Sequence, residues 1–420
     1  MLSKQDNETL TQTDQGTPMG DLMRRFWIPA LLAEEVSECD GKPVRLKLLG
    51  ENLVAFRDTQ GRVGLLEEGC PHRCASLALA VNDDGGLRCL YHGWKFTVDG
   101  TCVDTPTEPE GSKLPTKVRA VAYPTREAGG AIWTYLGPPE LQPVFPAFEF
   151  LNMAEGHSAV FKILEDCNYG QAVEGTIDSA HAGILHRESP WGQPAKFDHE
   201  RDLCPRLEFE NTLYGLRYAG TRKFRDEHFH ARITQFMMPV FTLIPPDGAG
   251  VRKHRRMANA FVPRDDESTW HIQWFFDETQ PIDIAYRVEE GGHWVDENYR
   301  KLLNIDNWYS QDRQMMKTQN MSGIRGILTQ DHAVSETQGR ILDRTKEHLG
   351  TSDIAVIAWR RLMLQAAQEL AEKGETPSAL TPEIPWGKIK AETIIFPNSS
   401  DWKEQAPLAD EVKLSFGKTA

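Results

Sequence analysis

Two short segments of this chain, residues 70–74 (CPHRC) and 89–94 (CLYHGW), repeat one arrangement of metal-binding side chains. Each segment offers a thiol followed within three residues by an imidazole, and sixteen residues separate the first imidazole from the second thiol. Two thiolates on one iron and two neutral imidazoles on the other can hold a 2Fe-2S cluster, and the imidazoles raise its reduction potential. The candidate cluster ligands are Cys70, His72, Cys89 and His92.

A structural zinc site is the competing interpretation of these four residues, because tetrahedral zinc also accepts two thiolates and two imidazoles. Zinc sites usually pair like ligands, with CxxC followed by HxxxH, whereas here the two kinds alternate. The alternation favours the iron–sulfur cluster. Cys74 is left over in the first segment, and we expect it to be a free thiol and not a fifth ligand.

The composition around these segments is that of a globular protein with more than one domain. The chain has 420 residues, 40% hydrophobic and 26% charged, and this length favours two domains. Its 47 basic and 61 acidic residues give a net charge of −14, which argues against nucleic acid as a partner. We find neither a membrane-length apolar run nor an apolar export signal, so we expect a cytoplasmic location and no membrane contact. An odd number of cysteines, seven, favours metal ligation or free thiols over disulfides.

Strand, turn and helix patterns divide the chain into three parts. Residues 18–36 mix apolar positions with an interior Pro29, which predicts a short broken helix, and we assign residues 1–38 to an N-terminal helical segment packed on the largest domain. Residues 39–150 carry hairpin patterns and predict a small antiparallel β domain around the cluster. Residues 151–420 mix both patterns, with a clear helix ending at Gly374. They predict a larger α+β domain, an antiparallel sheet with helices, so the fold class is α+β.

A second group of possible metal ligands lies about ninety residues beyond the cluster segments, in DSAHAGILH at positions 178–186. Two histidines and one carboxylate can bind iron(II) and leave coordination positions open. On an ideal helix of 3.6 residues per turn, His181 and His186 would point roughly 140° apart, so an undistorted helix could not bring them together. Gly183 between them is a place where the helix could loosen.

The forms CPHRC and CLYHGWKF resemble the Rieske domain of ring-hydroxylating oxygenases. The resemblance implies that Cys70 and Cys89 bind one iron of a 2Fe-2S cluster and that His72 and His92 bind the other. It also implies that residues 39–150 are a Rieske domain and residues 151–420 a catalytic domain. Electron-carrier Rieske proteins have a further cysteine in both loops, and the second loop here has none, which disfavours that branch.

A Rieske motif followed by DxxHxxxxH is the order of motifs found in the Rieske non-heme iron oxygenases, which this chain resembles. In that family the two histidines bind a mononuclear iron(II), and the resemblance assigns this role to His181 and His186. Asp178 resembles the bridging aspartate of this family. That residue accepts hydrogen bonds from an iron-binding histidine, here His181, and from a cluster histidine of the neighbouring subunit, here His92. The bridge implies a head-to-tail trimer. Gly175 stands where many relatives have an asparagine near the iron, so that contact is not expected here.

The family resemblance also implies a third iron ligand, an aspartate far downstream. Our assignment is Asp331, which lies 145 residues beyond His186 and is followed five residues later by Glu336. Asp343 is the competing candidate, and the alternative for it is a helix or turn aspartate paired with Arg344.

The resemblance extends over nearly the whole chain. GTPMGDLMRRFWIPALL at 16–32, EGTIDSAH at 174–181 and ETQGRILDRTKEHLGTSD at 336–353 resemble the phthalate dioxygenase group. This implies a terminal oxygenase that hydroxylates an aromatic carboxylate with dioxygen. Electrons would come from NADH through a separate flavin and iron–sulfur reductase, and the assembly would be a homotrimer or stacked homohexamer without a β subunit. The alternatives are a monooxygenase that O-demethylates a methoxy-aromatic acid and, in a different class, an electron-transfer protein.

The substrate pocket is less defined by the sequence. The apolar run from Phe236 to Phe241 fits a pocket wall or a sheet core equally well. An anionic ring substrate would need an arginine, because bidentate pairing offsets the desolvation of a carboxylate, and the candidates are Arg206 and Arg217. We expect His228 and His230 to be surface residues of a strand and not ligands.

Overall fold

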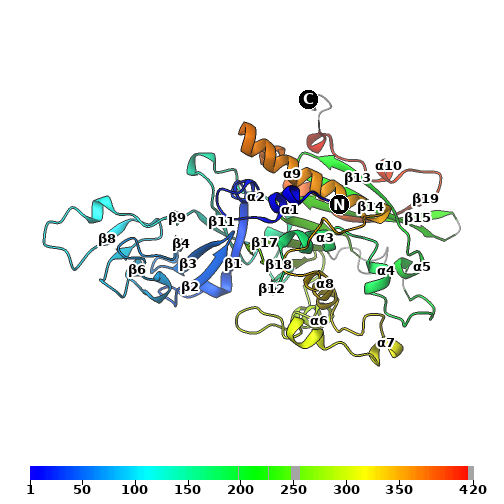
Figure 1. Ribbon diagram of the computed structural model, residues 1–420, viewed down its shortest axis with the longest axis horizontal. Coiled ribbons are helices and arrows are strands. Elements are labelled where there is room, and N and C mark those ends of the chain that lie inside the picture. The colour runs from blue at the N-terminus through cyan, green and yellow to red at the C-terminus, as the bar shows by residue number, and fades with distance from the viewer. Residues whose placement is uncertain (197, 226, 247–255, 415–420) are drawn as a thin grey trace.

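The structure is a computed structural model and describes residues 1–196, 198–225, 227–246 and 256–414. Four antiparallel sheets organise the described residues. In Figure 1 the two small four-stranded sheets form a narrow lobe at one end, and the eight-stranded sheet with most of the helices forms a broad lobe at the other. The small antiparallel β domain and the larger α+β domain predicted from the sequence are both present.

The narrow lobe consists of two short sheets and the loops between their strands. One sheet has the order β2 (Val44–Leu48), β3 (Glu51–Arg57), β4 (Val63–Glu67) and β9 (Ala122–Tyr123), and the other β5 (Val81–Asp83), β6 (Gly86–Arg88), β7 (Lys95–Phe96) and β8 (Cys102–Asp104). Buried residues of both sheets, including Phe56, Leu87 and Phe96, form one core that also contains Cys70 and Cys89. The small core therefore holds both cysteine loops in place through Cys70 and Cys89.

The predicted broken helix over residues 18–36 is wrong in its second half. After α1 (Lys4–Thr11) and α2 (Pro18–Met23), the chain forms strand β1 (Trp27–Leu32). This strand lies at the edge of the three-stranded sheet, next to β11 (Ala131–Tyr135), which also pairs with β10 (Thr125–Ala128). Pro29 is tolerated there because an edge strand need not donate every backbone hydrogen bond. All six β1 residues are buried, so the continuous apolar run reflects a doubly covered strand and not one helix face.

The eight-stranded sheet is the frame of the broad lobe. Its path is β12 (Ser158–Glu165), β18 (Ser268–Phe276), β17 (Arg256–Asp265), β16 (Phe241–Ile244), β15 (His228–Met237), β14 (Gly215–Phe224) and β13 (Arg206–Thr212), and β19 (Glu392–Pro397) also pairs with β15. Every residue of β18 is buried, since both faces of the sheet are covered there. The run from Phe236 to Phe241 belongs to the apolar core of this lobe and does not line the cavity, so the sheet-core interpretation holds.

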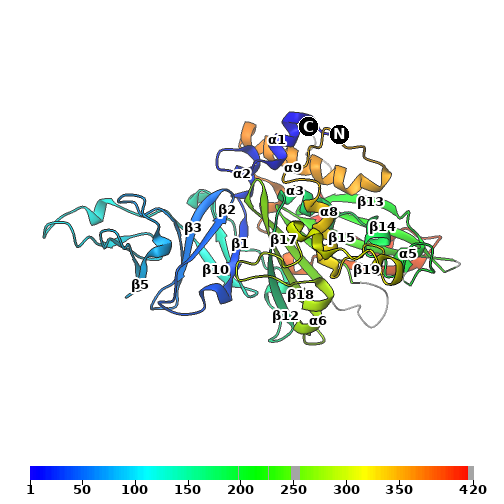
Figure 2. The same ribbon diagram turned by 60° about the horizontal axis from the view of Figure 1, so that its bottom comes forward.

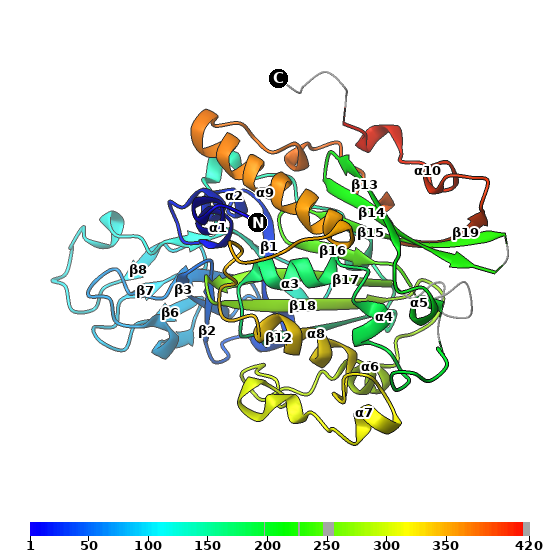
Figure 3. The ribbon, with the colours of Figure 1, turned by 45° about the vertical axis from the view of Figure 1, so that its right-hand side comes forward.

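Helices cover the sheet and position the candidate site. They are α3 (Tyr169–Thr176), α4 (Ala182–Leu185), α5 (Asp198–Arg201), α6 (Ile284–Gly291), α7 (Met315–Thr318), α8 (Ile327–Glu336), α9 (Ile354–Lys373) and α10 (Trp402–Gln405). Figure 3 shows α3 in front of β16, β17 and β18, with α8 beside it. The predicted C-terminal helix is confirmed as α9, which ends at Gly374 in the left-handed conformation that glycine adopts without strain. Figure 2 shows α1 and α2 next to α9.

Short 3₁₀ segments link these elements: Ala33–Val36, Leu77–Leu79, Pro115–Lys117, Pro139–Leu141, Glu149–Leu151, Ile305–Ser310, Thr351–Asp353, Ser378–Leu380, Trp386–Lys388 and Asp410–Val412. Within the described part of the chain, no helix is both long enough and apolar enough to cross a bilayer.

Candidate metal centres and their cavity

The two cysteine loops are structural repeats of each other. The Cys74 backbone N–H donates to the Cys70 carbonyl at 2.8 Å, and the Gly93 N–H donates to the Cys89 carbonyl at 2.9 Å. The fifth residue of each loop is left-handed, with φ of 55° at Cys74 and 73° at Gly93. One loop geometry, used twice, thus presents a cysteine and a histidine from each side.

The side chains of these loops fit a Rieske cluster. Cys70 and Cys89 are buried and adjacent, and burial raises the pKa of Cys70 to about 11, so that a metal must displace its proton. The rings of His72 and His92 lie 4.5 Å apart between centroids, and Trp94 stacks on His72 at 4.3 Å. His92 Nδ1 is buried without a hydrogen-bond partner among the described residues, as expected of a ligand atom. The Cys74 thiol is exposed and free.

A second group of ligand atoms converges in the broad lobe, from His181, His186 and Asp331. The two Nε2 atoms are 3.2 Å apart, and Asp331 Oδ1 lies 3.6 Å from His181 Nε2 and 3.1 Å from His186 Nε2. Metal–ligand bonds of about 2.0–2.2 Å at angles of about 90–109° separate two ligand atoms by about 2.8–3.6 Å. All three separations fall in this window, so one ion can contact all three atoms.

The chain brings the two histidines together in a different way from the one predicted. Helix α3 ends at Thr176, and the chain leaves the helical path before α4, a helix of only four residues. His181 and His186 flank this helix at its two ends, while Gly183 is buried inside it. The expected distortion at Gly183 is wrong, because the helix breaks upstream of His181.

Neighbouring side chains select the nitrogen that each histidine presents. The Asp178 carboxylate lies 3.4 Å from His181 Nδ1. Gln330 Oε1 lies 2.8 Å from His186 Nδ1, and the Gln330 amide is oriented because its Nε2 donates to the Ile324 carbonyl. Both Nδ1 atoms therefore carry the proton, and both Nε2 lone pairs face the centre. Gln330 was missed in the sequence, where adjacency to Asp331 was the only available signal.

Asp343 lies away from this group. Its carboxylate is exposed and pairs with Lys346 at 2.9 Å. The expected pairing with Arg344 is wrong, because Arg344 is fully buried and bonds to Glu174 at 2.9 Å. Only Asp331 of the two candidates approaches the histidines.

A cavity of about 1240 Å³ opens beside His181, His186 and Asp331. Its lining includes three arginines that were not predicted: Arg232, Arg256 and Arg287. The two predicted arginines lie outside the lining. Arg206 is exposed and pairs with Glu208 at 2.8 Å, and Arg217 is buried against Trp402 and pairs with Glu210.

The two strand histidines differ in position. His228 is exposed as expected, but His230 is buried and lines the cavity, so the surface prediction is wrong for His230. The predicted alternation is not seen, because burial rises steadily from His228 to His230 and the strand beyond is covered on both faces.

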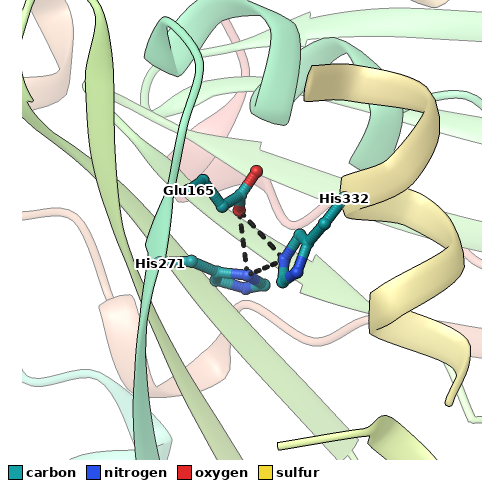
Figure 4. Close-up of side chains that lie close together, drawn as sticks. All are labelled: Glu165, His271 and His332. Carbon is teal, nitrogen blue, oxygen red and sulfur yellow. Dashed lines mark hydrogen bonds and ion pairs between the residues drawn. The ribbon is translucent and has the colours of Figure 1, made fainter. Parts of the chain in front are cut away.

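A third convergence of ligand atoms was missed entirely. Glu165, His271 and His332 lie together in the wall of the same cavity (Figure 4). They are more buried than His181, His186 and Asp331. Their positions in the sequence, 106 and 61 residues apart, give no spacing signal.

A β domain with two cysteine–histidine loops, joined to an α+β domain with a histidine–carboxylate group spaced for one metal ion, is the arrangement of a Rieske-type oxygenase. Comparison with known proteins agrees. The Rieske 2Fe-2S domain family matches residues 26–122, and the family described as LigXa C-terminal domain like matches residues 134–416. The chain therefore belongs to the Rieske non-heme iron oxygenases, in the phthalate dioxygenase-like group. Its cofactors are a 2Fe-2S cluster and a mononuclear iron.

Individual relatives span almost the whole chain. The phthalate 4,5-dioxygenase oxygenase subunit of Pseudomonas putida is 38% identical over 96% of this chain and 94% of its own length. The 3-chlorobenzoate-3,4-dioxygenase oxygenase subunit of Comamonas testosteroni is 34% identical over 96% and 97%. The 5,5'-dehydrodivanillate O-demethylase oxygenase subunit of a Sphingobium strain is 31% identical over 90% and 84%.

Among solved structures, dicamba monooxygenase bound to dicamba shares the fold. Its TM-score is 0.61 at 21% identity, covering 84% of this chain and 99% of that one. This likeness concerns the fold, and the relatives that span the chain show it to be the terminal oxygenase subunit of a Rieske system.

Proposed function

We propose that this oxygenase hydroxylates an aromatic carboxylate and that the carboxylate is bound by the arginines of the cavity. The main support is Arg232 on β15, which lines the cavity beside His230. Burial and the neighbouring charge of Arg232 lower the pKa of Arg222 on β14. A guanidinium in the cavity wall can pair with a carboxylate through two parallel hydrogen bonds, so Arg232 is the candidate for binding the anion.

We also propose the residues that hold the cofactors. Cys70, His72, Cys89 and His92 bind the cluster, and His181, His186 and Asp331 bind the mononuclear iron. When bound, the cluster transfers single electrons and the iron supplies a site for dioxygen chemistry. Asp178 and Gln330 hold protons on the Nδ1 atoms of the two iron-binding histidines and so keep both Nε2 atoms available.

The proposed electron path crosses between subunits. Figure 1 places β5–β8, with the cysteine loops, at one end of the chain and α4 at the opposite side, so one chain does not bring its own two sites together. Asp178 is 26% exposed, and Leu90 and Tyr91 in the second cysteine loop are exposed. We propose that Asp178 accepts a hydrogen bond from His92 of a neighbouring copy in a head-to-tail trimer, alone or stacked as a hexamer, without a β subunit.

In this proposal residues 1–38 form a segment packed on the catalytic domain, residues 39–150 the Rieske domain and residues 151–420 the catalytic domain. A flavin and iron–sulfur reductase passes electrons from NADH to the cluster in the cytoplasm.

A substrate panel with matched variants tests the proposal. Purified protein with dioxygen, NADH and a compatible reductase is offered aromatic dicarboxylates, monocarboxylates and their methyl esters, and product and NADH use are measured. We expect turnover of the acids and not of the esters. Arg232→Gln should raise KM for the acid by about tenfold or more, because a charge-assisted pair is lost, whereas the exposed Arg206→Gln should not. Equal turnover of acids and esters would contradict the proposed substrate class.

O-demethylation of a methoxy-aromatic acid is the second candidate, favoured by the likeness to an O-demethylase subunit over 90% of the chain. Release of one formaldehyde per product from methoxybenzoates, with no ring hydroxylation of the unsubstituted acids, would replace the first proposal with this one.

A further inference from the structure

Glu165, His271 and His332 form a buried group at the centre of the broad lobe. Glu165 is the last residue of β12, His271 lies on the neighbouring strand β18, and His332 lies on α8, directly after Asp331 (Figure 4). Their side chains are only 2–4% exposed. Three elements that are far apart in the sequence therefore contribute one ionisable side chain each to the same buried point.

The spacing of the ligand atoms matches that of a metal site. His271 Nδ1 lies 3.1 Å from Glu165 Oε1, His332 Nε2 lies 3.3 Å from Glu165 Oε1, and the two nitrogens are 3.3 Å apart. These values lie in the window of about 2.8–3.6 Å expected for ligands of one ion. They are more uniform than the separations of 3.1–3.6 Å in the group that contains Asp331.

The Glu165 carboxylate distinguishes a metal site from an ordinary ion pair, because one of its oxygens lacks a hydrogen bond. Glu165 Oε1 is buried and makes no hydrogen bond within the described residues, although two imidazole nitrogens lie within 3.3 Å of it. A buried carboxylate oxygen without a hydrogen bond is costly. The two imidazole nitrogens are within hydrogen-bond distance of each other at 3.3 Å. A cation between the three atoms would satisfy the Glu165 oxygen that no hydrogen bond satisfies.

The surroundings of His271 expose the correct nitrogen. Asn259 Oδ1 lies 3.0 Å from His271 Nε2, and the Asn259 amide is oriented because its Nδ2 donates to Thr242 Oγ1. His271 Nε2 therefore carries a proton, and Nδ1 has its lone pair available towards Glu165 and His332. This is the same arrangement that Gln330 imposes on His186, with the two ring nitrogens exchanged.

We propose that Glu165, His271 and His332 bind a second divalent transition-metal ion, distinct from the mononuclear iron. Two imidazoles and a carboxylate suit Zn²⁺ or Fe²⁺. Because its ligands are almost fully buried, the ion has a structural role: it ties β12, β18 and α8 together. Through His332 it fixes the turn of α8 that carries Asp331, so the three residues act as positioning residues for the iron ligand.

Metal counting on the holoenzyme tests the proposal directly. Wild-type protein, loaded with its cluster and iron and supplied with Zn²⁺, should contain four metal ions per chain by inductively coupled plasma mass spectrometry: two in the cluster, the mononuclear iron and the buried ion. Anomalous scattering at the zinc and iron edges should place a peak between Glu165, His271 and His332 in wild-type crystals. Three ions per chain and no such peak would overturn the second site and leave the proposed oxygenase intact.

Variants test which residues bind the fourth ion. Glu165→Gln should contain three ions and keep the visible spectrum of the cluster. Addition of Zn²⁺ should raise the Tm of the wild type but not the Tm of this variant. Glu188→Gln, which changes an exposed carboxylate of the same cavity, should keep all four ions. His186→Ala should lose the mononuclear iron and keep the buried ion. Loss of the catalytic iron in Glu165→Gln with its retention in His186→Ala would overturn both assignments. If Glu165→Gln does not fold, the anomalous peak in the wild type still decides.

Discussion

Two histidine–carboxylate groups share one cavity wall in this oxygenase and differ mainly in exposure. The His181–His186–Asp331 group has side chains 15–33% exposed, whereas the Glu165–His271–His332 group is 2–4% exposed. The separations of their ligand atoms are alike. Catalytic metal sites keep a coordination position open and structural sites are closed. The spacing of the ligand atoms therefore allows either group to hold a metal ion, and burial distinguishes the group that could meet dioxygen and substrate.

Removing a ligand of the open group should have the largest effect on activity. His181→Ala should reduce product formation to background, because only two protein ligands remain, while the visible spectrum of the cluster is unchanged. Substrate-dependent product formation and the absorption spectrum are measured on the same preparation. Joint loss of activity and cluster would contradict two separate sites.

A change at the far end of α8 should destabilise the fold that carries both groups. Lys301 Nζ donates to Glu336 Oε1 at 2.5 Å and to the Leu164 carbonyl at 2.6 Å, and both Lys301 and Glu336 are buried. Breaking a buried pair from one side leaves an uncompensated charge, so Lys301→Met should lower the free energy of unfolding by about 3–5 kcal/mol. Chemical denaturation measures this. Lys346→Met, which breaks the exposed pair with Asp343, is the control and should leave stability unchanged. A similar loss in both variants would show that the buried pair has no special role.

The side chains behind each group should act on one metal only. Gln330→Ala removes the acceptor behind His186, and Asn259→Ala removes the acceptor behind His271. Each should weaken its own ion by about 10–100-fold, the usual effect of such partners, and leave the other ion unchanged. Competition with a chelator, followed by metal analysis, gives both affinities. Equal weakening of both ions by either variant would mean that the two groups act as one site.

The smallest effect is expected at Asp343. Asp343→Asn should leave iron content, cluster spectrum and turnover at wild-type levels, because this carboxylate lies at the surface and pairs with Lys346. Iron analysis and NADH-coupled turnover check it. Loss of one iron per chain would make Asp343, and not Asp331, the third ligand.

The cluster loops and the cavity differ in how far they could be predicted. The candidate cluster ligands lie in two short segments, so local spacing was enough to find them. The candidate iron ligands His181 and His186 lie in one segment and were also found from the sequence. The position of the helix break that brings them together was not predicted, because it depends on what the following residues pack against. Glu165, His271 and His332 have no local pattern at all. Their proximity depends on the strand register that pairs Ile163 with His271 and on the packing of α8 against the sheet.

Burial was the other property that escaped prediction. Pro29 lies in an edge strand, His230 faces the cavity, and Arg217 is covered by Trp402 although a strand arginine is normally solvated. Each of these outcomes depends on a neighbour that is distant in the sequence. Local pattern gives the type of element, whereas the neighbouring elements decide which of its faces is covered.

The sequence by itself determined the α+β class through its strand and helix patterns. It also determined the family and the cofactors, because thiolates and imidazoles at fixed local spacing have few other uses. Only the tertiary structure decided which arginines reach the cavity, which aspartate approaches the histidines and that Glu165, His271 and His332 meet at one buried point. The physical reason is that ligation and charge pairing act over about 2–4 Å. Contacts of that range between residues more than a hundred positions apart are set by strand register and helix packing.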